Sequence, residues 1–307
     1  MLHKKVVFMG TPGFSVSILE AIAKSSYKIS CVYTQESKKS NRGQKLNNTP
    51  VFEQAKKLKL TVRNPKNLNT EEELKFLREL NPDIVLVVAY GQLISKEFLN
   101  IPKEGFINIH ASLLPKWRGA APMQRSIMNS ETETGVSIMK ITEGLDAGPV
   151  MKKIKVKIDE TITTAKLSKN LSKISSDIIV KVLNDIFNKN FKFIEQNHKL
   201  ATYAKKIKKN EAEINWNEPA KMILAKINGL NPKPGAWFKY KNTRYKIWEA
   251  RIVEKKGTPG TILNDNFIIC CGDKSLEIIE IQKEGKNKLT LKSFLMGLNF
   301  KKDDVLK

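Results

Sequence analysis

The chain has 307 residues, 41% of them hydrophobic, and carries a formal net charge of +23 at pH 7. That length and apolar content suffice for one large domain or two ordinary ones around a buried core, and they exclude a disordered chain. The longest apolar run, 84–90, is far shorter than the roughly 20 residues that cross a bilayer, and the opening residues lead into a strand-like run rather than a signal peptide. We therefore expect a cytoplasmic protein without a membrane-spanning segment.

The cysteines and the charge narrow the chemistry further. Cys31, Cys270 and Cys271 have neither metal-ligand spacing nor a paired framework, so we predict packing roles in a reducing compartment and no bound metal. Of the 54 basic residues, 47 are Lys, and the positive charge therefore has two explanations. It could attract a polyanion such as nucleic acid, or it could reflect a compositional bias toward Lys.

Strand and helix patterns alternate through the first half of the chain. In chain order we expect strand Lys5–Met9, helix Ser15–Lys24, strand Ile29–Thr34, helix Val51–Leu58, helix Thr70–Leu80, strand Ile84–Ala89, strand Phe106–His110, helix Ala121–Asn129, strands Val136–Ile141 and Val150–Ile158, and helix Thr163–Asn188. The strand at 84–89 is apolar throughout, as a strand covered on both faces should be. This alternation predicts an α/β domain with a doubly wound, mostly parallel, Rossmann-like sheet, which we assign to residues 1–188.

The pattern changes in the second half. Residues 189–209 are rich in Lys and weakly patterned, and we interpret them as a basic linker. One helix near Pro219–Asn228 is then followed by the turn 231–235 and by short strands separated by Gly and Asn. We predict that residues 210–307 form a smaller C-terminal β-barrel domain of the OB-like type.

Two polar side chains stand out in the strand 106–110. Asn108 and His110 are two residues apart, so both side chains point to one side, at the carboxyl end of a sheet where open α/β sheets bind ligands. On the N-x-H match alone, a buried structural histidine is the simpler interpretation. The segment 111–119 contains a proline and a glycine and cannot continue a central strand, which places His110 at a strand end.

A carboxylate is a candidate to complete this group. Asp146 lies in the glycine-bounded loop 143–148 between two predicted strands. From there it could reach His110 and orient the ring. On local grounds alone, an ordinary turn aspartate is the simpler interpretation.

Longer stretches of the sequence resemble a known family. The runs INIHASLLPKWRGAAPMQRSI and GVSIMKITEGLDAGPVM are similar to the formyltetrahydrofolate-dependent formyltransferases, whose catalytic Asn, His and Asp correspond to Asn108, His110 and Asp146. The runs VVFMGTPGFSVSILEAI, VVAYGQLI, RGQKLNNTPV, TYAKKI, INW and NGLNPKPGAWF resemble the branch of that family that acts on methionyl-tRNA. The matches extend over nearly the whole chain.

The resemblance implies a reaction and a pair of substrates. The formyl donor is 10-formyltetrahydrofolate, the acceptor is the amino group of methionyl-initiator tRNA, and the product serves translation initiation. In this acyl transfer we expect Asn108 to donate a hydrogen bond to the oxygen of the tetrahedral intermediate, while His110 and Asp146 handle the protons. The folate pocket implied by the resemblance is bordered by Ser112, Leu113, Leu114, Pro115, Val87, Tyr90 and Gly91.

The resemblance also implies where the tRNA binds. The loop 35–49 follows the second strand, as an inserted tRNA-binding loop does in the family, and we expect contacts from Arg42 and Lys45. This loop carries Ser-Lys-Lys-Ser-Asn where the family pattern is rich in Pro. We expect further contacts from Lys205 and Lys206 and from the C-terminal domain, and we expect the protein to be a monomer.

Three other readings share part of this pattern. A glycinamide ribonucleotide formyltransferase would have the same Asn, His and Asp, but it normally ends near the first domain. An amino-sugar-nucleotide formyltransferase can also carry a small C-terminal domain, and a non-catalytic nucleic-acid-binding protein could share the basic character. The positive charge and the Arg42 loop favour tRNA over a sugar nucleotide, and an intact Asn, His and Asp set favours an enzyme.

Overall fold

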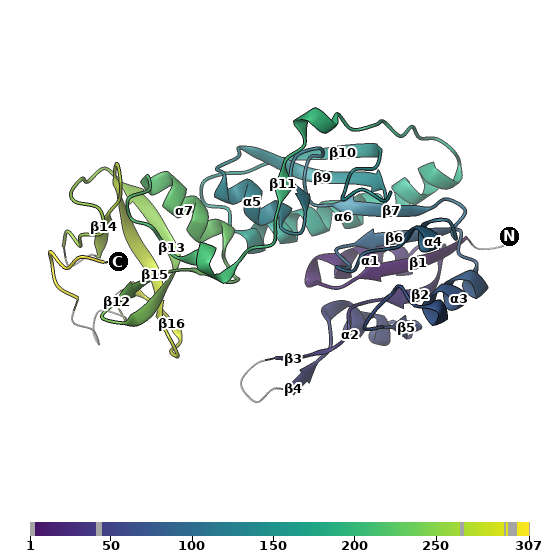
Figure 1. Ribbon diagram of the computed structural model, residues 1–307, viewed down its shortest axis with the longest axis horizontal. Coiled ribbons are helices and arrows are strands. Elements are labelled where there is room, and N and C mark those ends of the chain that lie inside the picture. Colours follow the sequence, from purple (N-terminus) through teal and green to yellow (C-terminus); the bar gives the residue numbers. More distant parts are fainter. Residues whose placement is uncertain (1–3, 41–44, 265–266, 292, 294–299, 307) are drawn as a thin grey trace. The chain divides into compact units, whose positions relative to one another are not determined.

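The computed structural model of the protein describes residues 4–40, 45–264, 267–291, 293 and 300–306 (Figure 1). The chain divides into two units. The first comprises Met1–Ala120, Gly135–Val156 and Ser168–Ala204, and the second comprises Ala121–Thr134, Lys157–Leu167 and Lys205–Lys307. The domain boundaries expected from the sequence stay a prediction.

A seven-stranded sheet runs through the first unit in the order β10-β9-β7-β6-β1-β2-β5. Its strands are β1 (Lys5–Gly10), β2 (Lys28–Tyr33), β5 (Val62–Arg63), β6 (Ile84–Val88), β7 (Phe106–His110), β9 (Glu133–Lys140) and β10 (Val150–Lys157). The neighbours from β5 to β7 pair in parallel, whereas β9 pairs with β7 in antiparallel orientation. The predicted mostly parallel α/β sheet is therefore confirmed.

Helices bury both faces of this sheet. They are α1 (Val16–Ala23), α2 (Pro50–Lys57), α3 (Glu71–Leu80), α4 (Lys96–Leu99) and α6 (Thr164–Phe187). Val7 of β1 and Val85 of β6 belong to one apolar cluster with residues of α3 and α4. Val6 and Phe8, the neighbours of Val7 along β1, are also fully buried but lie outside that cluster. Successive side chains of a strand point to opposite faces, so the central strands are covered on both sides.

The ends of the helices follow the signals in the sequence. The hydroxyl of Thr70 accepts a 3.4 Å hydrogen bond from the backbone N–H of Glu73, and three glutamates occupy the first turn of α3. Negative charge at this end complements the helix dipole. Asn81 then ends α3 in the left-handed conformation, with φ of 43°.

The polar stretch 35–49, expected to be a loop, contains two three-residue strands. These are β3 (Lys38–Ser40) and β4 (Lys45–Asn47), which pair in antiparallel orientation. Such short strands carry no alternation of apolar and polar residues, which is why the sequence pattern does not reveal them. Arg42 lies outside the described residues.

Two further short strands lie beside the central sheet in the first unit. β8 (Arg118–Gly119) and β11 (Tyr203–Ala204) pair in parallel, so the chain that returns after α6 runs along the segment that follows β7. The backbone N–H of Arg118 donates to the carbonyl of Thr202 at 2.9 Å, and that of Ala120 donates to the carbonyl of Ala204 at 2.9 Å. These hydrogen bonds tie two distant segments together.

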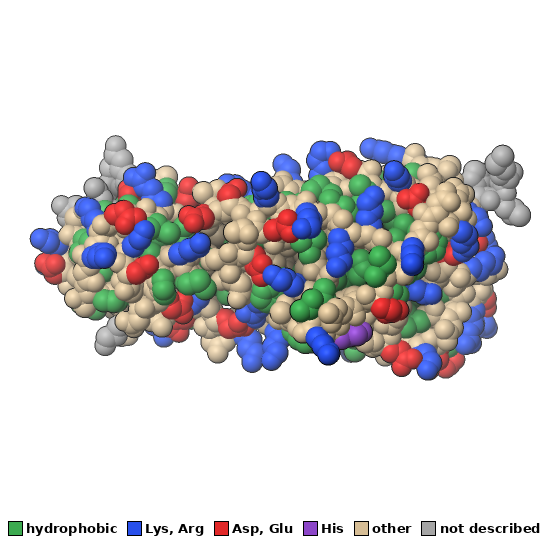
Figure 2. Space-filling view, turned by 90° about the horizontal axis from the view of Figure 1, so that it is seen from above, with side chains coloured by type: hydrophobic (Ala, Val, Ile, Leu, Met, Phe, Trp, Pro, Cys, Tyr) green, Lys and Arg blue, Asp and Glu red, His purple; other side chains and the backbone are tan. Residues whose placement is uncertain are grey.

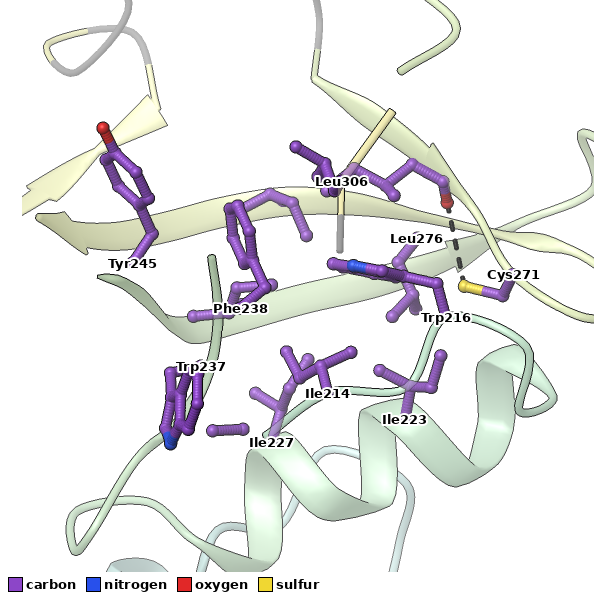
Figure 3. Close-up of a cluster of buried hydrophobic side chains, with 14 of the residues drawn as sticks. Ile214, Trp216, Ile223, Ile227, Trp237, Phe238, Tyr245, Cys271, Leu276 and Leu306 are labelled. Atoms are coloured by element: carbon purple, nitrogen blue, oxygen red, sulfur yellow. Dashed lines mark hydrogen bonds between the residues drawn. The ribbon is translucent and has the colours of Figure 1, made fainter. Parts of the chain in front are cut away.

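The second unit is built on a curled antiparallel sheet. Its strands are β12 (Ala236–Tyr240), β13 (Thr243–Val253), β14 (Ile268–Cys270), β15 (Ser275–Lys283) and β16 (Lys288–Thr290), and its helices are α5 (Pro122–Met128) and α7 (Ala220–Gly229). Figure 3 shows Ile223 and Ile227 of α7 pointing into the same core as Phe238 and Leu276 of the sheet. The predicted smaller C-terminal β domain is confirmed. Within the described part of the chain, no helix is long and apolar enough to cross a membrane.

Candidate active site

The last residues of β7 carry the first two candidate catalytic side chains. Phe106, Asn108 and His110 alternate along the strand, so their side chains share one face, and Phe106 packs into the apolar cluster under α3. Asn108 pairs with Val87 of the neighbouring strand β6. The amide and the imidazole therefore lie at the carboxyl end of the parallel strands, where sheets of this kind bind their ligands.

Asp146 comes from the loop between β9 and β10 and meets both side chains. Its Oδ1 accepts a long hydrogen bond of 3.4 Å from Nδ2 of Asn108. Its Oδ2 lies 3.6 Å from Nδ1 of His110. The structure thus brings the three predicted catalytic residues together, although 38 residues separate Asn108 from Asp146 along the chain.

Two backbone groups of the turn after β7 fix this arrangement. The backbone N–H of Gly119 donates a 2.8 Å hydrogen bond to Oδ2 of Asp146. Nε2 of His110 lies 3.0 Å from the carbonyl oxygen of Trp117. Because a carbonyl oxygen only accepts, Nε2 carries the proton in this contact and Nδ1 is the nitrogen that faces Asp146. The sequence analysis missed both backbone groups, and the proximity of the Trp-Arg-Gly run to His110 was the only signal for them.

The site is enclosed but open to solvent on the side of the carboxylate. The side chain of His110 is 6% exposed and that of Asp146 is 17% exposed. An amide donor and a protonatable ring that both approach one partly accessible carboxylate can stabilise an oxyanion and transfer protons. In the described ranges, no three His, Cys, Asp or Glu side chains gather as a metal site would require.

The predicted folate segment after β7 is hydrogen-bonded to Ser137 of β9. The hydroxyl of Ser137 donates to the carbonyl of Ser112 at 2.7 Å and accepts from the backbone N–H of Leu114 at 3.1 Å. Leu114 is fully buried, and the peptide bond between Leu114 and Pro115 is cis. Leu113 and Pro115 are half-buried, whereas Ser112 and Leu114 are buried. These two are the side chains of the segment that a bound pterin could touch.

The second predicted folate segment, after β6, offers mainly its backbone. The ring of Tyr90 is 1% exposed and packs in the core, and burial raises the pKa of its phenol well above the ordinary range. The carbonyl of Tyr90 accepts a 2.7 Å hydrogen bond from the hydroxyl of Thr11. Gly91 is exposed with φ of 84°, and Val87 is buried beside Asn108. The folate-binding roles of all seven residues stay predictions.

The predicted tRNA contacts are distributed over separate segments. Lys205 and Lys206 are exposed directly after β11. Lys45 lies in β4, but its side chain is outside the described part of the structure, as is the whole of Arg42. Figure 2 shows Lys and Arg side chains spread over much of one face and interspersed with acidic ones, rather than gathered in a single patch.

Two side chains that the sequence analysis did not single out support the Asp146 loop, one directly and one through the other. Gln196 contacts the loop directly, and Arg118 contacts Gln196. Arg118 lies in a run that resembles the formyltransferases, whereas Gln196 lies in the segment interpreted as a linker. Only the tertiary structure brings them to the site.

Similarity to known proteins agrees with this geometry. The sequence profile of the formyl transferases matches residues 4–183, and the profile of the formyl transferase C-terminal domain matches residues 206–299. The methionyl-tRNA formyltransferase of Pelagibacter ubique is 50% identical over 298 residues, which cover 96% of this chain and 96% of that protein. The chain belongs to the methionyl-tRNA formyltransferase family. The methionyl-tRNA formyltransferase of Bradyrhizobium diazoefficiens is 40% identical over 302 residues, 97% of each chain.

The fold also occurs in formyltransferases outside the methionyl-tRNA formyltransferase family. The crystal structure of the N-formyltransferase from Helicobacter canadensis, a complex with folinic acid and dTDP-3-aminofucose, superposes with a TM-score of 0.68 at 20% identity. It covers 92% of this chain, and this chain covers 100% of it. At that identity the likeness concerns the fold, and the full-length similarity to methionyl-tRNA formyltransferases decides the family.

Proposed function

We propose that this protein transfers the formyl group of 10-formyltetrahydrofolate to the amino group of methionyl-initiator tRNA, giving N-formylmethionyl-tRNA for translation initiation. The observation that carries the proposal is the meeting of Asn108, His110 and Asp146 at the end of β7. It occurs in a chain that is similar to a methionyl-tRNA formyltransferase over 96% of its length. The substrates are inferred from the similarity to that enzyme, and the catalytic groups are inferred from the positions of the three side chains.

The reaction exchanges one C–N bond for another. The amino nitrogen of the methionyl group attacks the formyl carbon, a tetrahedral intermediate forms, and the bond from that carbon to N10 of the folate breaks. The attacking nitrogen loses one proton and N10 gains one, so atoms and charge balance. The enzyme must therefore stabilise the negative oxygen of the intermediate and carry one proton between two nitrogens.

Each side chain has a role that its surroundings support. Nδ2 of Asn108 donates to the oxyanion, which is worth on the order of 3 kcal/mol for a donor held in place. Asp146 is the more exposed of the two proton carriers, and Gly119 holds its Oδ2. It accepts the amine proton, while His110 stabilises the charges that develop beside it.

The polyanionic acceptor suits the charge of the protein. A net charge of +23 creates a field that attracts tRNA, and the exposed Lys205 and Lys206 can contact phosphates. Arg42 and Lys45 belong to the same proposal. We propose that the protein is a monomer and that it acts in the cytoplasm, where both substrates of the formyl transfer would be present.

An acceptor competition tests the proposal. The purified protein is incubated with 10-formyltetrahydrofolate and, in parallel, with methionyl-tRNA, a dTDP-amino sugar and glycinamide ribonucleotide. The dTDP-amino sugar is included because of the fold likeness to the Helicobacter canadensis enzyme. We expect formylation of methionyl-tRNA only. Formylation of the sugar nucleotide instead would overturn the proposed acceptor while keeping the reaction class.

A further inference from the structure

The loop that carries Asp146 is held in a strained backbone conformation. Asp146 has φ of 46°, in the left-handed region that residues other than glycine rarely adopt. Such a conformation costs on the order of 1 kcal/mol or more and persists only where the surroundings impose it. The loop therefore needs partners that keep it in place.

Gln196 is such a partner. Its Nε2 donates a 2.8 Å hydrogen bond to the carbonyl oxygen of Asp146 and a 2.7 Å hydrogen bond to the carbonyl oxygen of Gly148. The two carbonyls lie on either side of the bend, so one amide group spans it. The side chain is 7% exposed, and water cannot readily replace it there.

Arg118 fixes the amide in the orientation that this contact requires. Oε1 of Gln196 accepts from Nε of Arg118 at 3.2 Å and from Nη2 at 2.8 Å. Because a guanidinium only donates and a carbonyl only accepts, the amide cannot turn over without losing all four hydrogen bonds. The guanidinium itself is buried, with Arg118 only 3% exposed, and Nη2 also lies 3.2 Å from Nδ1 of His198.

The same short segment holds Asp146 from two sides. The backbone N–H of Gly119 binds the carboxylate, while the side chain of the preceding Arg118 acts through Gln196 on the main chain of the loop. The pairing of β8 with β11 ties residues 118–119 to residues 203–204, only a few positions beyond Gln196. The Asp146 loop, the turn after β7 and the segment after α6 are thus hydrogen-bonded to one another.

We infer that Gln196, oriented by Arg118, is a positioning residue that keeps the carboxylate of Asp146 against Asn108 and His110. The inference rests on the proposed formyl transfer. The contacts of Asp146 with these two residues, at 3.4 Å and 3.6 Å, are long, so a small shift of the loop breaks them. A displacement of about 1 Å in a catalytic group can lower a rate about 100-fold.

Gln196→Glu is the variant that isolates this role. The carboxylate has the same shape and still pairs with Arg118, but it cannot donate to the two carbonyls and repels them. We expect kcat for formylation of methionyl-tRNA to fall about 10- to 100-fold, with KM for 10-formyltetrahydrofolate unchanged within about threefold. A merely structural role would lower the melting temperature and leave kcat of the folded protein unchanged.

Asn228→Asp serves as the matched control. Asn228 is 6% exposed in the second unit, and its Nδ2 donates a 2.7 Å hydrogen bond to the carbonyl of Glu160. The exchange is the same, from a buried amide that binds a carbonyl to a carboxylate, at a residue that is not one of the predicted site residues. We expect it to lower the melting temperature with kcat unchanged.

The outcomes separate the inference from the proposed function. If the wild-type protein formylates no methionyl-tRNA, the proposed function is wrong. If the wild type is active and folded Gln196→Glu keeps kcat within about threefold, the positioning role is wrong and the function stands. Should Gln196→Glu not fold, Gln196→Asn, with an amide one methylene shorter, is measured in the same way. Failure of both variants to fold would also overturn the inference, because Gln196 would then be needed for folding rather than for positioning Asp146.

Discussion

Nε2 of His110 donates a 3.0 Å hydrogen bond to the carbonyl oxygen of Trp117, seven residues further along the chain. Trp117 has φ of 61°, so the turn after β7 bends sharply enough to bring this carbonyl back onto the ring. The contact fixes which ring nitrogen carries the proton, and it leaves Nδ1 facing Asp146. When Nδ1 takes up a proton, the nearby carboxylate of Asp146 can therefore stabilise the positive charge of the ring.

The amide of Asn108 is the group that we expect to bind the oxyanion. In Asn108→Ala this donor is lost, and the rate of formyl transfer in a single turnover should fall by about 100- to 1,000-fold. The affinity for tRNA should stay the same, because the residue is not among the predicted tRNA contacts. Asn108→Asp, of equal size but without a donor, should be at least as slow. A single-turnover rate of Asn108→Ala within about threefold of the wild type would contradict the role.

Gly148, like Gln196, constrains the conformation of the Asp146 loop. A Cβ at this position would lie 2.0 Å from the carbonyl oxygen of Lys140, so the loop has to move to accommodate it. Gly148→Ala should therefore lower the free energy of unfolding by about 1–3 kcal/mol and reduce formylation activity. Urea denaturation measures the first effect. Gly13→Ala is the control, since a Cβ there meets nothing within 4 Å; equal stability of the two variants would refute the steric argument.

Lys205 and Lys206 are expected to bind tRNA phosphates. Replacing both by Gln should weaken binding of methionyl-tRNA and reduce the slope of log Kd against log salt concentration by about 1 for each lost contact. The control replaces the exposed Lys152 and Lys153 of β10 by Gln, which removes the same charge from the first unit at residues that are not among the predicted tRNA contacts. Fluorescence titrations at several salt concentrations give the slopes. Identical slopes for the two double variants would show that only net charge matters.

Glu211 offers a test of pH dependence. Its hydrogen bonds with the guanidinium of Arg125, at 2.7 Å and 3.2 Å, hold the pKa of Glu211 below its ordinary value. A carboxyl group with a lowered pKa in the folded state stabilises the fold above its unfolded pKa, about 4.3, and this contribution is lost as the pH falls through the folded pKa.

Glu211→Gln should therefore be less stable than the wild type at pH 7, by on the order of 1 kcal/mol for this partly exposed pair. The difference should shrink as the pH falls below about 4. Thermal denaturation at a series of pH values measures it. A stability difference that stays constant down to pH 3 would mean that the charge of Glu211 contributes nothing.

The sequence predicts those parts of the fold that depend on local pattern. The strand 106–110 has the same bounds in the structure as in the prediction, because its apolar run ends at a proline- and glycine-containing turn. β5 has only two residues and was not predicted, since no periodicity can be recognised over that length. Longer helices and strands can thus be predicted from the sequence pattern, whereas strands of two or three residues cannot.

The site divides in the same way. The two-residue spacing predicts that Asn108 and His110 share a face, but the approach of Asp146 depends on how β9 and β10 are connected. The loop position made Asp146 a candidate, and the family resemblance favoured it over an ordinary turn aspartate. Gln196 could not be predicted, because it lies in a weakly patterned segment that reaches the loop through the pairing of β11 with β8. Contacts of this kind depend on tertiary structure alone.

The central claim is that the Asn108, His110 and Asp146 group performs formyl transfer to methionyl-tRNA. The most direct measurement is the single-turnover rate of this transfer from 10-formyltetrahydrofolate with purified His110→Ala beside the wild type, at saturating concentrations of both substrates. We predict rapid transfer by the wild type and a fall of at least about 100-fold in the variant, with an unchanged melting curve and tRNA affinity. Transfer by folded His110→Ala at the wild-type rate would contradict the account.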